Sequence, residues 1–449
     1  MRGLQTYVLI VASLFFYAYG QPLLVFLLLG SILINATASY QVLNAKTTLA
    51  KRVWATTGVV LNLGVLFFFK YGPLLVRSLG MNVADPGSLG AFLVSIPLPI
   101  GISFFTFQGI SLLIDVFRQK ESDPNRIVHQ SVWHHFVDTA FFKAFFPQLV
   151  AGPIVKAHDF YPQIGPKYLS NVKWESVFRA LVIGYFLKMV VADNLKDLTF
   201  WIEYPYFLKS STPTLLTMLF GYSIQIFADF AGYSLIAIGI ARIFGYELME
   251  NFNFPYISQS LSEFWRRWHI SLSSWLREYL YFPLGGNRKG EFRTYLNLMI
   301  VMVLGGLWHG ASWSYAVWGL FHGVGLAVER WLQARRAAEV PSRFSIVRVL
   351  FVFSYVTLAW LLFKLPKFEH VIAFIQACFS NWTMPSDTRL MAFVFLYSAP
   401  VVVYHALAVR KSRGGIPVSS AWQQLAYATC LFALLVNSGS SGAFIYFQF

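Results

Sequence analysis

The chain has 449 residues, of which 57% are hydrophobic and only 12% are charged, with a formal net charge of +15. Soluble globular domains carry about 25% charged residues, so this composition excludes that class and indicates a polytopic membrane protein. The basic residues do not form an aromatic-interleaved face, which argues against nucleic acid as a partner. Two cysteines, Cys378 and Cys430, make neither a disulfide framework nor a metal site, and we expect no metal.

In chain order, long runs without formal charge supply the expected membrane segments. Residues 3–45 are long enough for two spans, broken at Gly20-Gln21-Pro22, and further uncharged runs cover residues 53–69, 86–114, 210–228, 349–363 and 414–449. A helix needs about 20 residues to cross a hydrocarbon layer of about 30 Å. We therefore expect an all-α polytopic membrane protein with roughly ten or eleven membrane segments, some of them short or re-entrant.

Two apolar stretches contain Pro and Gly, namely SIPLPIGISFF at residues 95–105 and FPQLVAGPI at residues 146–154. Non-helical backbone at membrane depth survives only where protein buries it or where it lines a cavity. The stretches therefore indicate an interior chamber, and ordinary kinks in packed helices are the alternative interpretation.

Clusters of Lys and Arg at the ends of the apolar runs predict which side of the membrane each end faces. The positive-inside rule places such clusters in the cytoplasm, and they comprise Lys46, Lys51 and Arg52; Arg330, Arg335, Arg336, Arg343 and Arg348; and Arg410, Lys411 and Arg413. The two segments between the last two clusters then form a hairpin whose turn, near residues 366–389, lies outside. His322 precedes Arg330 by eight helical residues, about 12 Å of rise, so we expect it near the middle of the bilayer.

Residues 260–280, SLSEFWRRWHISLSSWLREYL, predict one amphipathic helix that begins with a capping box of Ser260 and Glu263. A Trp-rich side faces an Arg-rich side, which is typical of a helix lying in the membrane interface. His269 falls on the apolar side, where it faces protein or lipid rather than water. The helix is either an anchor or a gate at the cytoplasmic mouth, where Arg266, Arg267 and Arg277 attract an anionic donor.

Two other residues, His309 and Asp229, stand out in the membrane segments. If His309 and His322 share one helix, they lie about 220° apart around its axis and point in different directions, so His309 is expected to be structural or to line a tunnel wall. Asp229 is an intramembrane carboxylate and therefore a functional candidate. The alternative interpretation of Asp229, which we favour, is a structural ion pair with Arg242, Arg266 or another base.

Several motifs together resemble the membrane-bound O-acyltransferase family, most closely its alginate-acetylating branch. They are PQLVAGPI (147–154), ADFAGYSLIAIG (228–239), the long block ENFNFPYISQSLSEFWRRWHISLSSWLREYLYFPLGGNR (250–288), LGGLWHG (304–310), WGLFHG (318–323) and FIYFQF (444–449). The resemblance implies a funnel-shaped membrane domain over residues 1–449, with a tunnel between the two faces and the core catalytic region at residues 250–330. Residues 414–449 would supply a last span and a tail at the outer face.

The resemblance also implies an activity, a location and partners. The protein would be a multi-pass protein of a bacterial inner membrane, without a permanently bound cofactor, that takes an acetyl group from a cytosolic donor, acetyl-coenzyme A. It would deliver this group to hydroxyls of an extracytoplasmic polysaccharide resembling alginate, directly or through a periplasmic or membrane-anchored acetyltransferase. From the residues alone, a transporter or channel and a scaffold of a polymer-export complex are the alternatives, because broken helices and buried polar residues suit these as well.

The family's near-invariant histidine corresponds to His322 and a second active-site position to His269. An imidazole suits a general base that takes the proton from an attacking hydroxyl, whereas a packing histidine bonded to a backbone carbonyl is the plain alternative. His269 or a tryptophan indole could donate to the developing oxyanion. Besides the arginines above, the tunnel candidates are His309, Trp308, Asp229 and Trp265.

The C-terminal FIYFQF needs a separate explanation, because terminal tails are usually polar. A membrane-interface aromatic belt is the plain interpretation of Tyr446 and its neighbours. The alternative hypothesis, suggested by similar aromatic C-termini in such transferases, is that Tyr446 carries the acetyl group transiently as a phenolic ester.

Overall fold

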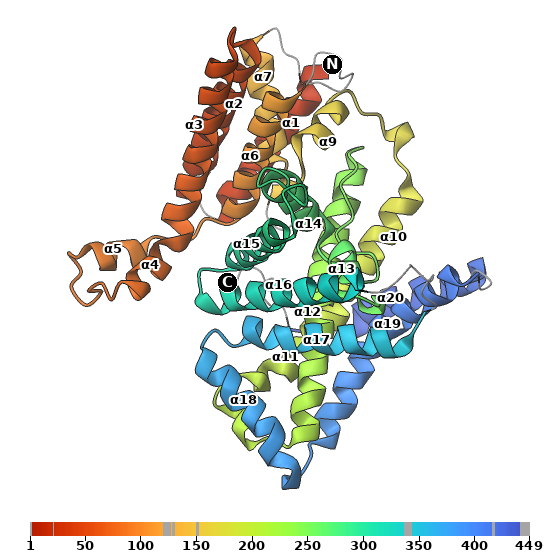
Figure 1. Cartoon of the computed structure of the whole chain (residues 1–449). Coiled ribbons are helices and arrows are strands. Elements are labelled where there is room, and N and C mark those ends of the chain that lie inside the picture. The colour runs from red at the N-terminus through yellow and green to blue at the C-terminus, as the bar shows by residue number, and fades with distance from the viewer. Residues whose placement is uncertain are drawn as a thin grey trace. The chain divides into compact units, whose positions relative to one another are not determined.

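The computed structural model describes residues 2–20, 22–119, 127, 131–149, 152–335, 344–414 and 418–440. Helices and irregular segments make up this part of the chain, and it contains no strand (Figure 1). Its contacts divide it into two compact units, Met1–Trp174 with Ile240–Met249 and Glu175–Gly239 with Glu250–Phe449.

Six helices in the described part of the chain are long and apolar enough to cross a membrane, and they are Gly3–Gly20, Pro22–Asn44, Thr48–Ser78, Thr212–Ile243, Ile346–Lys364 and Thr388–Ser412. Ser420–Val436 is a shorter apolar helix. The expected all-α polytopic class is thereby confirmed. Other segments that the sequence predicts are shorter or broken helices.

The first unit begins with two helices separated at the predicted break, because the first helix ends at Gly20 and the chain restarts at Pro22. Its elements are α1 (Arg2–Gly20), η1 (Pro22–Leu24), α2 (Val25–Asn44), α3 (Thr48–Leu66), η2 (Phe67–Tyr71), α4 (Gly72–Ser78), α5 (Leu89–Ser95), α6 (Ile102–Arg118), α7 (Val132–Ala144), α8 (Phe146–Leu149), α9 (Ala157–Phe160), η3 (Tyr161–Gln163) and η4 (Leu169–Asn171).

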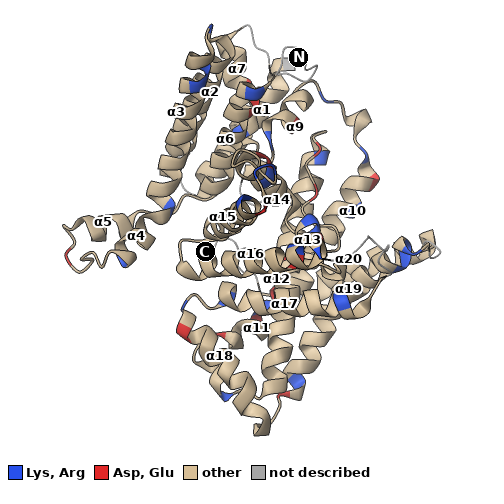
Figure 2. Ribbon diagram, in the orientation of Figure 1, with Lys and Arg blue, Asp and Glu red and all other residues tan. Residues whose placement is uncertain are grey.

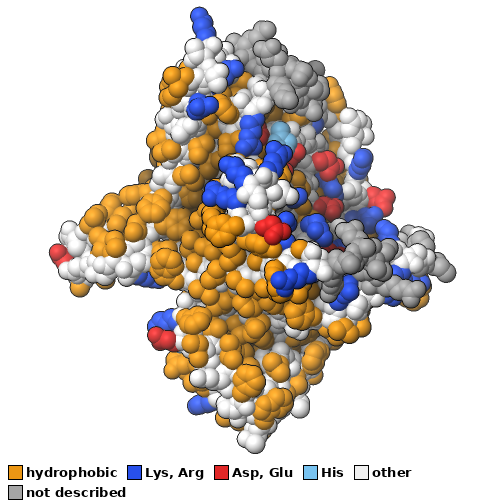
Figure 3. All heavy atoms as spheres, in the orientation of Figure 1, with side chains coloured by type: hydrophobic (Ala, Val, Ile, Leu, Met, Phe, Trp, Pro, Cys, Tyr) orange, Lys and Arg blue, Asp and Glu red, His pale blue; other side chains and the backbone are white. Residues whose placement is uncertain are grey.

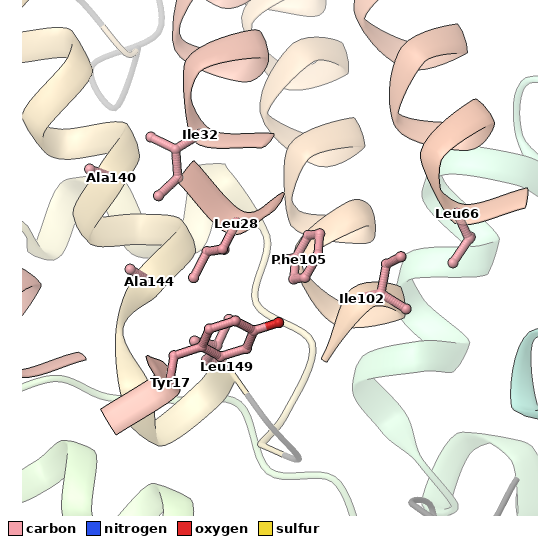
Figure 4. Close-up of a cluster of buried hydrophobic side chains, with 9 residues drawn as sticks. All are labelled: Tyr17, Leu28, Ile32, Leu66, Ile102, Phe105, Ala140, Ala144 and Leu149. Carbon is pink, nitrogen blue, oxygen red and sulfur yellow. The ribbon is translucent and has the colours of Figure 1, made fainter. Parts of the chain in front are cut away.

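Helix α2 lies against α3, α6 and α7, and one apolar cluster fills part of the space among them. Figure 4 shows its buried members, which are Tyr17, Leu28, Ile32, Leu66, Ile102, Phe105, Ala140, Ala144 and Leu149. Polar pairs cross the same helices, because the amides of Asn35 and Asn62 donate to each other's carbonyl oxygens at 3.1 and 2.9 Å. Apolar packing and paired amides together hold this unit.

The two Pro- and Gly-containing stretches are irregular in the structure. The uncharged run 86–114, expected as one span, is divided into α5 and α6, because the stretch with Pro97 and Pro99 cannot continue a helix and Gly101 adopts φ +75° before α6. From Gly152 to Lys156 the chain is non-helical, and Ile154 and Val155 are buried there, as the sequence predicts for such backbone. The irregular part of the first stretch is instead largely exposed, with Leu98 41% exposed, so the prediction of buried irregular backbone is wrong there.

The second unit contains the central motifs and the C-terminal helices. Its elements are α10 (Trp174–Tyr185), which begins at the end of the first unit, η5 (Phe186–Ala192), α11 (Asp193–Thr199), η6 (Phe200–Ile202), η7 (Tyr206–Lys209), α12 (Thr212–Ile243), whose last residues belong to the first unit, η8 (Pro255–Ile257), α13 (Leu261–Arg267), α14 (Ile270–Leu276), η9 (Arg277–Tyr281), α15 (Glu291–His309), α16 (Trp313–Ala334), α17 (Ile346–Lys364), α18 (Phe368–Ser380), η10 (Asn381–Thr383), α19 (Thr388–Ser412) and α20 (Ser420–Val436).

The surface of the described helices matches a protein surrounded by lipid. Large apolar side chains lie exposed on outer helices, including Phe395 and Leu396 on α19 and Leu435 on α20, and hydrophobic spheres cover much of the visible face in Figure 3. Lys and Arg are sparse along these helices and gather toward their ends (Figure 2). Both features fit the bilayer as solvent.

Candidate functional site

The imidazole of His322 lies completely buried on α16 among aromatic rings. Its ring centroid is 4.8 Å from that of Trp318, one turn earlier on the same helix, and 5.1 Å from that of Trp265 on α13. Phe264 lies parallel to the ring at 6.4 Å. Neither ring nitrogen of His322 has a hydrogen-bond partner in the described part of the chain. The alternative interpretation, a packing histidine bonded to a backbone carbonyl, is therefore not what the structure shows.

A buried polar group without a partner costs about 1–3 kcal/mol, so folds retain such groups mainly where function needs them. The indole N–H groups of Trp265 and Trp318 beside His322 are buried in the same way, without acceptors among the described residues. One proton acceptor and two proton donors thus face the interior of a single aromatic cluster. This arrangement provides the groups that general-base catalysis and oxyanion stabilisation require.

The prediction of one helix over residues 260–280 is wrong. Helix α13 ends at Arg267, α14 begins at Ile270, and a π-helical turn follows from Arg277. The break occurs because His269 adopts left-handed backbone angles of φ 42° and ψ 56°, which a helix cannot contain. The predicted cap at Ser260 is confirmed, since its hydroxyl accepts the Glu263 N–H at 3.0 Å.

His269 is fully buried at this break, as predicted from its position on the apolar side. Its Nδ1 lies 3.4 Å from Oδ1 of Asn251, and its ring meets that of Phe230 edge-on at 4.6 Å. Asn251 also accepts the backbone N–H and the hydroxyl of Ser271 at 3.3 and 2.6 Å. Asn251 therefore fixes the break and the histidine within it, a role that no local sequence pattern indicates.

His309 and His322 lie on different helices, so the expectation that one helix makes them point apart is wrong. Helix α15 ends at His309, and α16 begins at Trp313 after an irregular Gly310. The helices reverse direction there, and both histidines contact Trp318, His309 at 5.2 Å and His322 at 4.8 Å between ring centroids. His309 is also 6.2 Å from His269. The structure thus brings all three histidines into one group.

Trp308 belongs to the same group of rings. It is buried, and its ring lies 5.9 Å from that of His269 and 5.2 Å from that of His309. Phe363 of α17 lies 5.2 Å from His309 and 5.3 Å from Trp318. We call these rings, namely His269, Trp308, His309, Trp318, His322, Phe363 and Trp265, the aromatic group.

Two glycines allow α15 and α16 to lie close enough for these contacts. A Cβ atom at Gly306 would be 2.1 Å from the carbonyl oxygen of Tyr315, and one at Gly319 would be 2.2 Å from that of Met302. Both obstacles are backbone atoms, which no change of rotamer can remove. Glycine is therefore required at both positions for the histidines to meet.

A cavity of about 410 Å³, which we call the basic cavity, reaches the aromatic group from one side. It is lined by Ser262, Trp265, Arg266, Leu272, Ser273, Leu276, Arg277, Tyr281, Leu298, Val301, Met302, Gly305, His309, Trp318 and Leu326. Arg266 and Arg277 are exposed side chains, whereas His309 and Trp318 are buried. The cavity therefore joins a cationic surface to the rings around His322.

Arg267, the third arginine of the predicted donor site, does not line this cavity. Its guanidinium binds the Glu263 carboxylate at 2.9 Å and the carbonyl oxygen of Asn253 at 3.0 Å. The bond to Asn253 ties the segment before η8 to the end of α13. Of the three arginines, Arg266 and Arg277 are placed to meet an anion in the cavity.

A second cavity of about 540 Å³, which we call the mixed cavity, meets the aromatic group at Phe363. It is lined by Lys196, Asp197, Phe200, Trp201, Glu203, Tyr222, Gln225, Tyr315, Phe363, Lys364 and Pro366. Lys364 pairs with Glu203 at 2.8 Å, so these two charges of the cavity lining balance each other. Phe363 is in contact with His309 and Trp318 of the basic cavity, so one layer of rings separates the two cavities.

Asp229 forms a structural ion pair, as favoured from the sequence, but neither named arginine is the partner found. Lys188 of η5 places its ammonium 3.0 Å from Asp229 and 2.5 Å from Asp193. Arg242 instead binds Glu247 at 2.8 Å. All three members of the Lys188 cluster are nearly buried, so the cluster ties η5, α11 and α12 together inside the second unit.

Tyr446 lies outside the described residues, but the chain just before it is held at the mixed cavity. The ammonium of Lys196 donates to the carbonyl oxygen and hydroxyl of Ser440 at 3.1 and 3.2 Å, and that hydroxyl donates to Asp197 at 2.8 Å. Gly439 donates its N–H to Met189 at 2.9 Å. Since Lys196 and Asp197 line the mixed cavity, Ser440 is fixed at its edge.

The described chain is thus a polytopic helical membrane protein with three buried histidines beside two cavities. The sequence model of the membrane-bound O-acyltransferase family matches residues 102–368, and the chain belongs to that family. It is therefore an O-acyltransferase, rather than a transporter or a scaffold.

Relatives of this chain act on different polymers according to their names. It is 37% identical to the probable alginate O-acetylase AlgI of Pseudomonas putida, over 89% of this chain and 80% of that protein. It is 34% identical to the peptidoglycan O-acetyltransferase of Helicobacter pylori, over 82% of this chain and 72% of the relative. It is 26% identical to the teichoic acid D-alanyltransferase of Bacillus subtilis, over 76% and 87% respectively.

Proposed function

We propose that this protein transfers an acetyl group from acetyl-coenzyme A to hydroxyls of an extracytoplasmic polysaccharide resembling alginate, across a bacterial inner membrane. The similarity to the Pseudomonas putida protein, at 37% identity over 89% of the chain, supports the acetyl group and the polymer. The single observation that carries the mechanism is the buried imidazole of His322, whose two nitrogens have no partner within the described residues.

In this mechanism His322 acts as the general base. Its free ring nitrogen takes the proton from an acceptor hydroxyl while the hydroxyl oxygen attacks the carbonyl carbon of the acetyl thioester. The carbon–sulfur bond of the tetrahedral intermediate then breaks, the imidazolium returns the proton to the leaving thiolate, and an oxygen ester and free coenzyme A result. General-base catalysis of this kind contributes roughly 10²–10⁴-fold.

The negative charge that develops on the carbonyl oxygen needs donors already in place. The indole N–H groups of Trp265 and Trp318 have no acceptor within the described chain, and their rings flank His322. His269 is a further candidate donor. Its Nδ1 lies near Oδ1 of Asn251, and its ring is 6.2 Å from that of His309. Removing one such donor costs about 10²–10³-fold in catalysed rate.

The basic cavity is the proposed entrance for the donor. Coenzyme A carries phosphates, and Arg266 and Arg277 lie at the exposed part of the cavity, whereas its inner part is apolar. Arginines at the mouth would attract the phosphates, and the apolar inner part of the cavity leads to the rings around His322. This order suits a charged carrier with a thioester at its end. Arg266→Ala and Arg277→Ala should raise the KM for acetyl-coenzyme A more than they lower kcat.

The mixed cavity is the proposed side for the acceptor. Its lining combines aromatic rings, including Trp201 and Tyr222, with both signs of charge, which suits a hydroxyl-rich acceptor. The acceptor is a polysaccharide chain or the active-site residue of a periplasmic or membrane-anchored acetyltransferase that passes the group on. Purified protein given labelled acetyl-coenzyme A and alginate, with and without such a partner, distinguishes direct transfer from relayed transfer.

Tyr446 is proposed as a transient carrier of the acetyl group on this side. Its phenol would attack the thioester, lose its proton to His322 and later release the acetyl group to a polymer hydroxyl. Support comes from Ser440, six residues earlier, which is bound at the mixed cavity; six residues reach about 20 Å when extended. Tyr446→Phe keeps the ring and removes the hydroxyl, so unchanged polymer acetylation in this variant would exclude the carrier role.

The decisive test of the proposed function replaces the proposed base. His322→Ala should reduce acetyl transfer from labelled acetyl-coenzyme A at least 10²-fold, while the protein still folds and inserts into the membrane. His370→Ala is the matched control. His370 is not a member of the aromatic group, and its ring stacks on that of Tyr204 with 4.1 Å between centroids, so this variant should keep the wild-type rate. Wild-type transfer by the His322 variant would refute the mechanism.

A further inference from the structure

The carboxylate of Glu329 on α16 binds the first turn of α13. Its Oε2 accepts the backbone N–H of Leu261 at 2.5 Å, and its Oε1 accepts the backbone N–H and the hydroxyl of Ser262 at 3.1 and 2.5 Å. Glu329 follows His322 by seven residues, two turns along the same helix, or about 10 Å. One side chain therefore links the helix of the proposed base to the neighbouring helix.

These contacts supply hydrogen-bond acceptors to backbone N–H groups in the first turn of α13. The first N–H groups of a helix have no partner within the helix, and its dipole favours negative charge there. Ser260 accepts the N–H of Glu263, whereas Glu329 accepts those of Leu261 and Ser262. Hydrogen bonds to a charged carboxylate are about twice as strong as neutral ones, so Glu329 is a strong part of this attachment.

Helix α13 carries the side chains that surround the proposed base. Trp265 lies one turn after Leu261 and meets the His322 ring edge-on at 5.1 Å, and Phe264 stacks on it at 6.4 Å. Ser262, Trp265 and Arg266 of the same short helix line the basic cavity. A shift of the first turn of α13 therefore moves the indole beside His322 and the wall of the donor entrance together.

We propose that Glu329 is a positioning residue for acyl transfer, which fixes α13 against α16 and so holds Trp265 at the reacting side of His322. This inference rests on the proposed role of His322 as the base. Glu329 touches neither substrate nor base, and it acts through α13. A purely structural cap would change the amount of folded protein, whereas a positioning residue changes the turnover of each folded molecule.

The test compares Glu329→Ala and Glu329→Gln in the full-length protein in lipid nanodiscs, with labelled acetyl-coenzyme A as donor. A displacement of the order of 1 Å at a reacting group costs up to about 10²-fold in rate. Glu329→Ala should therefore lower kcat by roughly 10- to 100-fold per folded molecule and change the KM for acetyl-coenzyme A much less. Glu329→Gln should recover most of kcat, because the amide oxygen still accepts an N–H of α13.

The matched control is Glu369→Ala, which removes an exposed carboxylate at the start of α18 and should leave kcat unchanged. A second readout is independent of turnover: diethyl pyrocarbonate should modify His322, mapped by mass spectrometry, faster in Glu329→Ala than in wild type. If Glu329→Ala does not fold, Ser262→Ala removes one of the bonds to Glu329 and should lower kcat about two- to fivefold.

Unchanged kcat and unchanged modification of His322 in the folded Glu329→Ala protein would overturn the proposal. If that variant does not fold, wild-type kcat in Ser262→Ala would overturn it as well. The proposed function fails separately, by wild-type transfer in His322→Ala, and in that case the modification rate of His322 still reports whether Glu329 fixes α13.

Discussion

Replacing Gly319 with Ala tests the close approach of α15 and α16 that brings the histidines together. The new Cβ would lie 2.2 Å from the carbonyl oxygen of Met302 and 2.9 Å from the Cα of Val303. Because real Cβ atoms keep at least 3.0 Å from such neighbours, the two backbones must separate by about 0.8 Å at this point. Gly319 precedes His322 by three residues, so the displacement reaches the proposed base.

The expected magnitudes follow from this separation. Overpacking of this kind costs about 1–3 kcal/mol, and the better helix propensity of Ala returns up to about 1 kcal/mol. A displacement of nearly 1 Å between His322 on α16 and His309 on α15 should reduce acetyl transfer by roughly 10- to 100-fold. Gly319→Ala should therefore lower the rate of acetyl transfer even in the molecules that fold.

The assay measures the thermal unfolding temperature in detergent and the rate of acetyl transfer per folded molecule. Gly64→Ala on α3 is the matched control, because its Cβ would meet nothing within 4 Å. That variant should be neutral or slightly more stable, with unchanged activity. A Gly319→Ala protein with wild-type stability and wild-type transfer would refute the idea that helix separation governs the site.

Three further predictions concern other parts of the molecule. Lys188→Met leaves the buried carboxylates of Asp193 and Asp229 without their cation and should destabilise the protein by about 3–5 kcal/mol, seen as a lower unfolding temperature; an unchanged temperature would argue against the cluster. The hydrogen bond to Asp115 raises the pKa of His158, while burial acts in the opposite direction. This pair therefore stabilises the protein fully below pH about 6.5, the pKa of an unperturbed histidine. The stabilisation is lost as the pH rises through the higher pKa of the folded state. Asp115→Asn should therefore cost more stability at pH 5.5 than at pH 8. The difference should be no more than about 0.5 kcal/mol, because His158 is half-exposed to solvent. Equal losses of stability at both pH values would contradict this prediction. Gly439→Ala places a Cβ 2.6 Å from the backbone of Asp193 and Asn194 and should release the chain around Ser440, measured as faster proteolysis of the C-terminal tail; an unchanged rate would show that this attachment is not needed.

The sequence predicts features that depend on composition and local spacing. Uncharged runs gave the polytopic helical class, and the Ser260 cap and the burial of His269 followed from nearby residues. The position of His322 near the middle of the bilayer stays a prediction from its distance to Arg330, because burial within the protein does not report membrane depth. Membrane segments require apolar residues whatever their neighbours are, so these properties survive without knowledge of tertiary contacts.

The errors arose where long-range contacts or backbone angles decide the outcome. The amphipathic pattern over residues 260–280 does not reveal that the backbone of His269 adopts left-handed angles. The bonds that stabilise this break come from Asn251, eighteen residues earlier in the chain. The segment between His309 and His322 reads as one apolar helix, although a reversal at Gly310 places the two rings on one tryptophan. The ion pair of Asp229 is confirmed, but only the tertiary structure identifies Lys188 as the base that reaches it from another segment.

The layer of packed rings between the two cavities has an energetic consequence for the cell. Phe363, Trp318 and His309 are almost completely buried and lie in mutual contact, so hydrated ions find no continuous aqueous route through them. Bare ions cross apolar material only at great cost. A cell expressing many copies should therefore keep its ion gradients, and under the proposed function a small uncharged group passes from one chemical bond to the next within this layer.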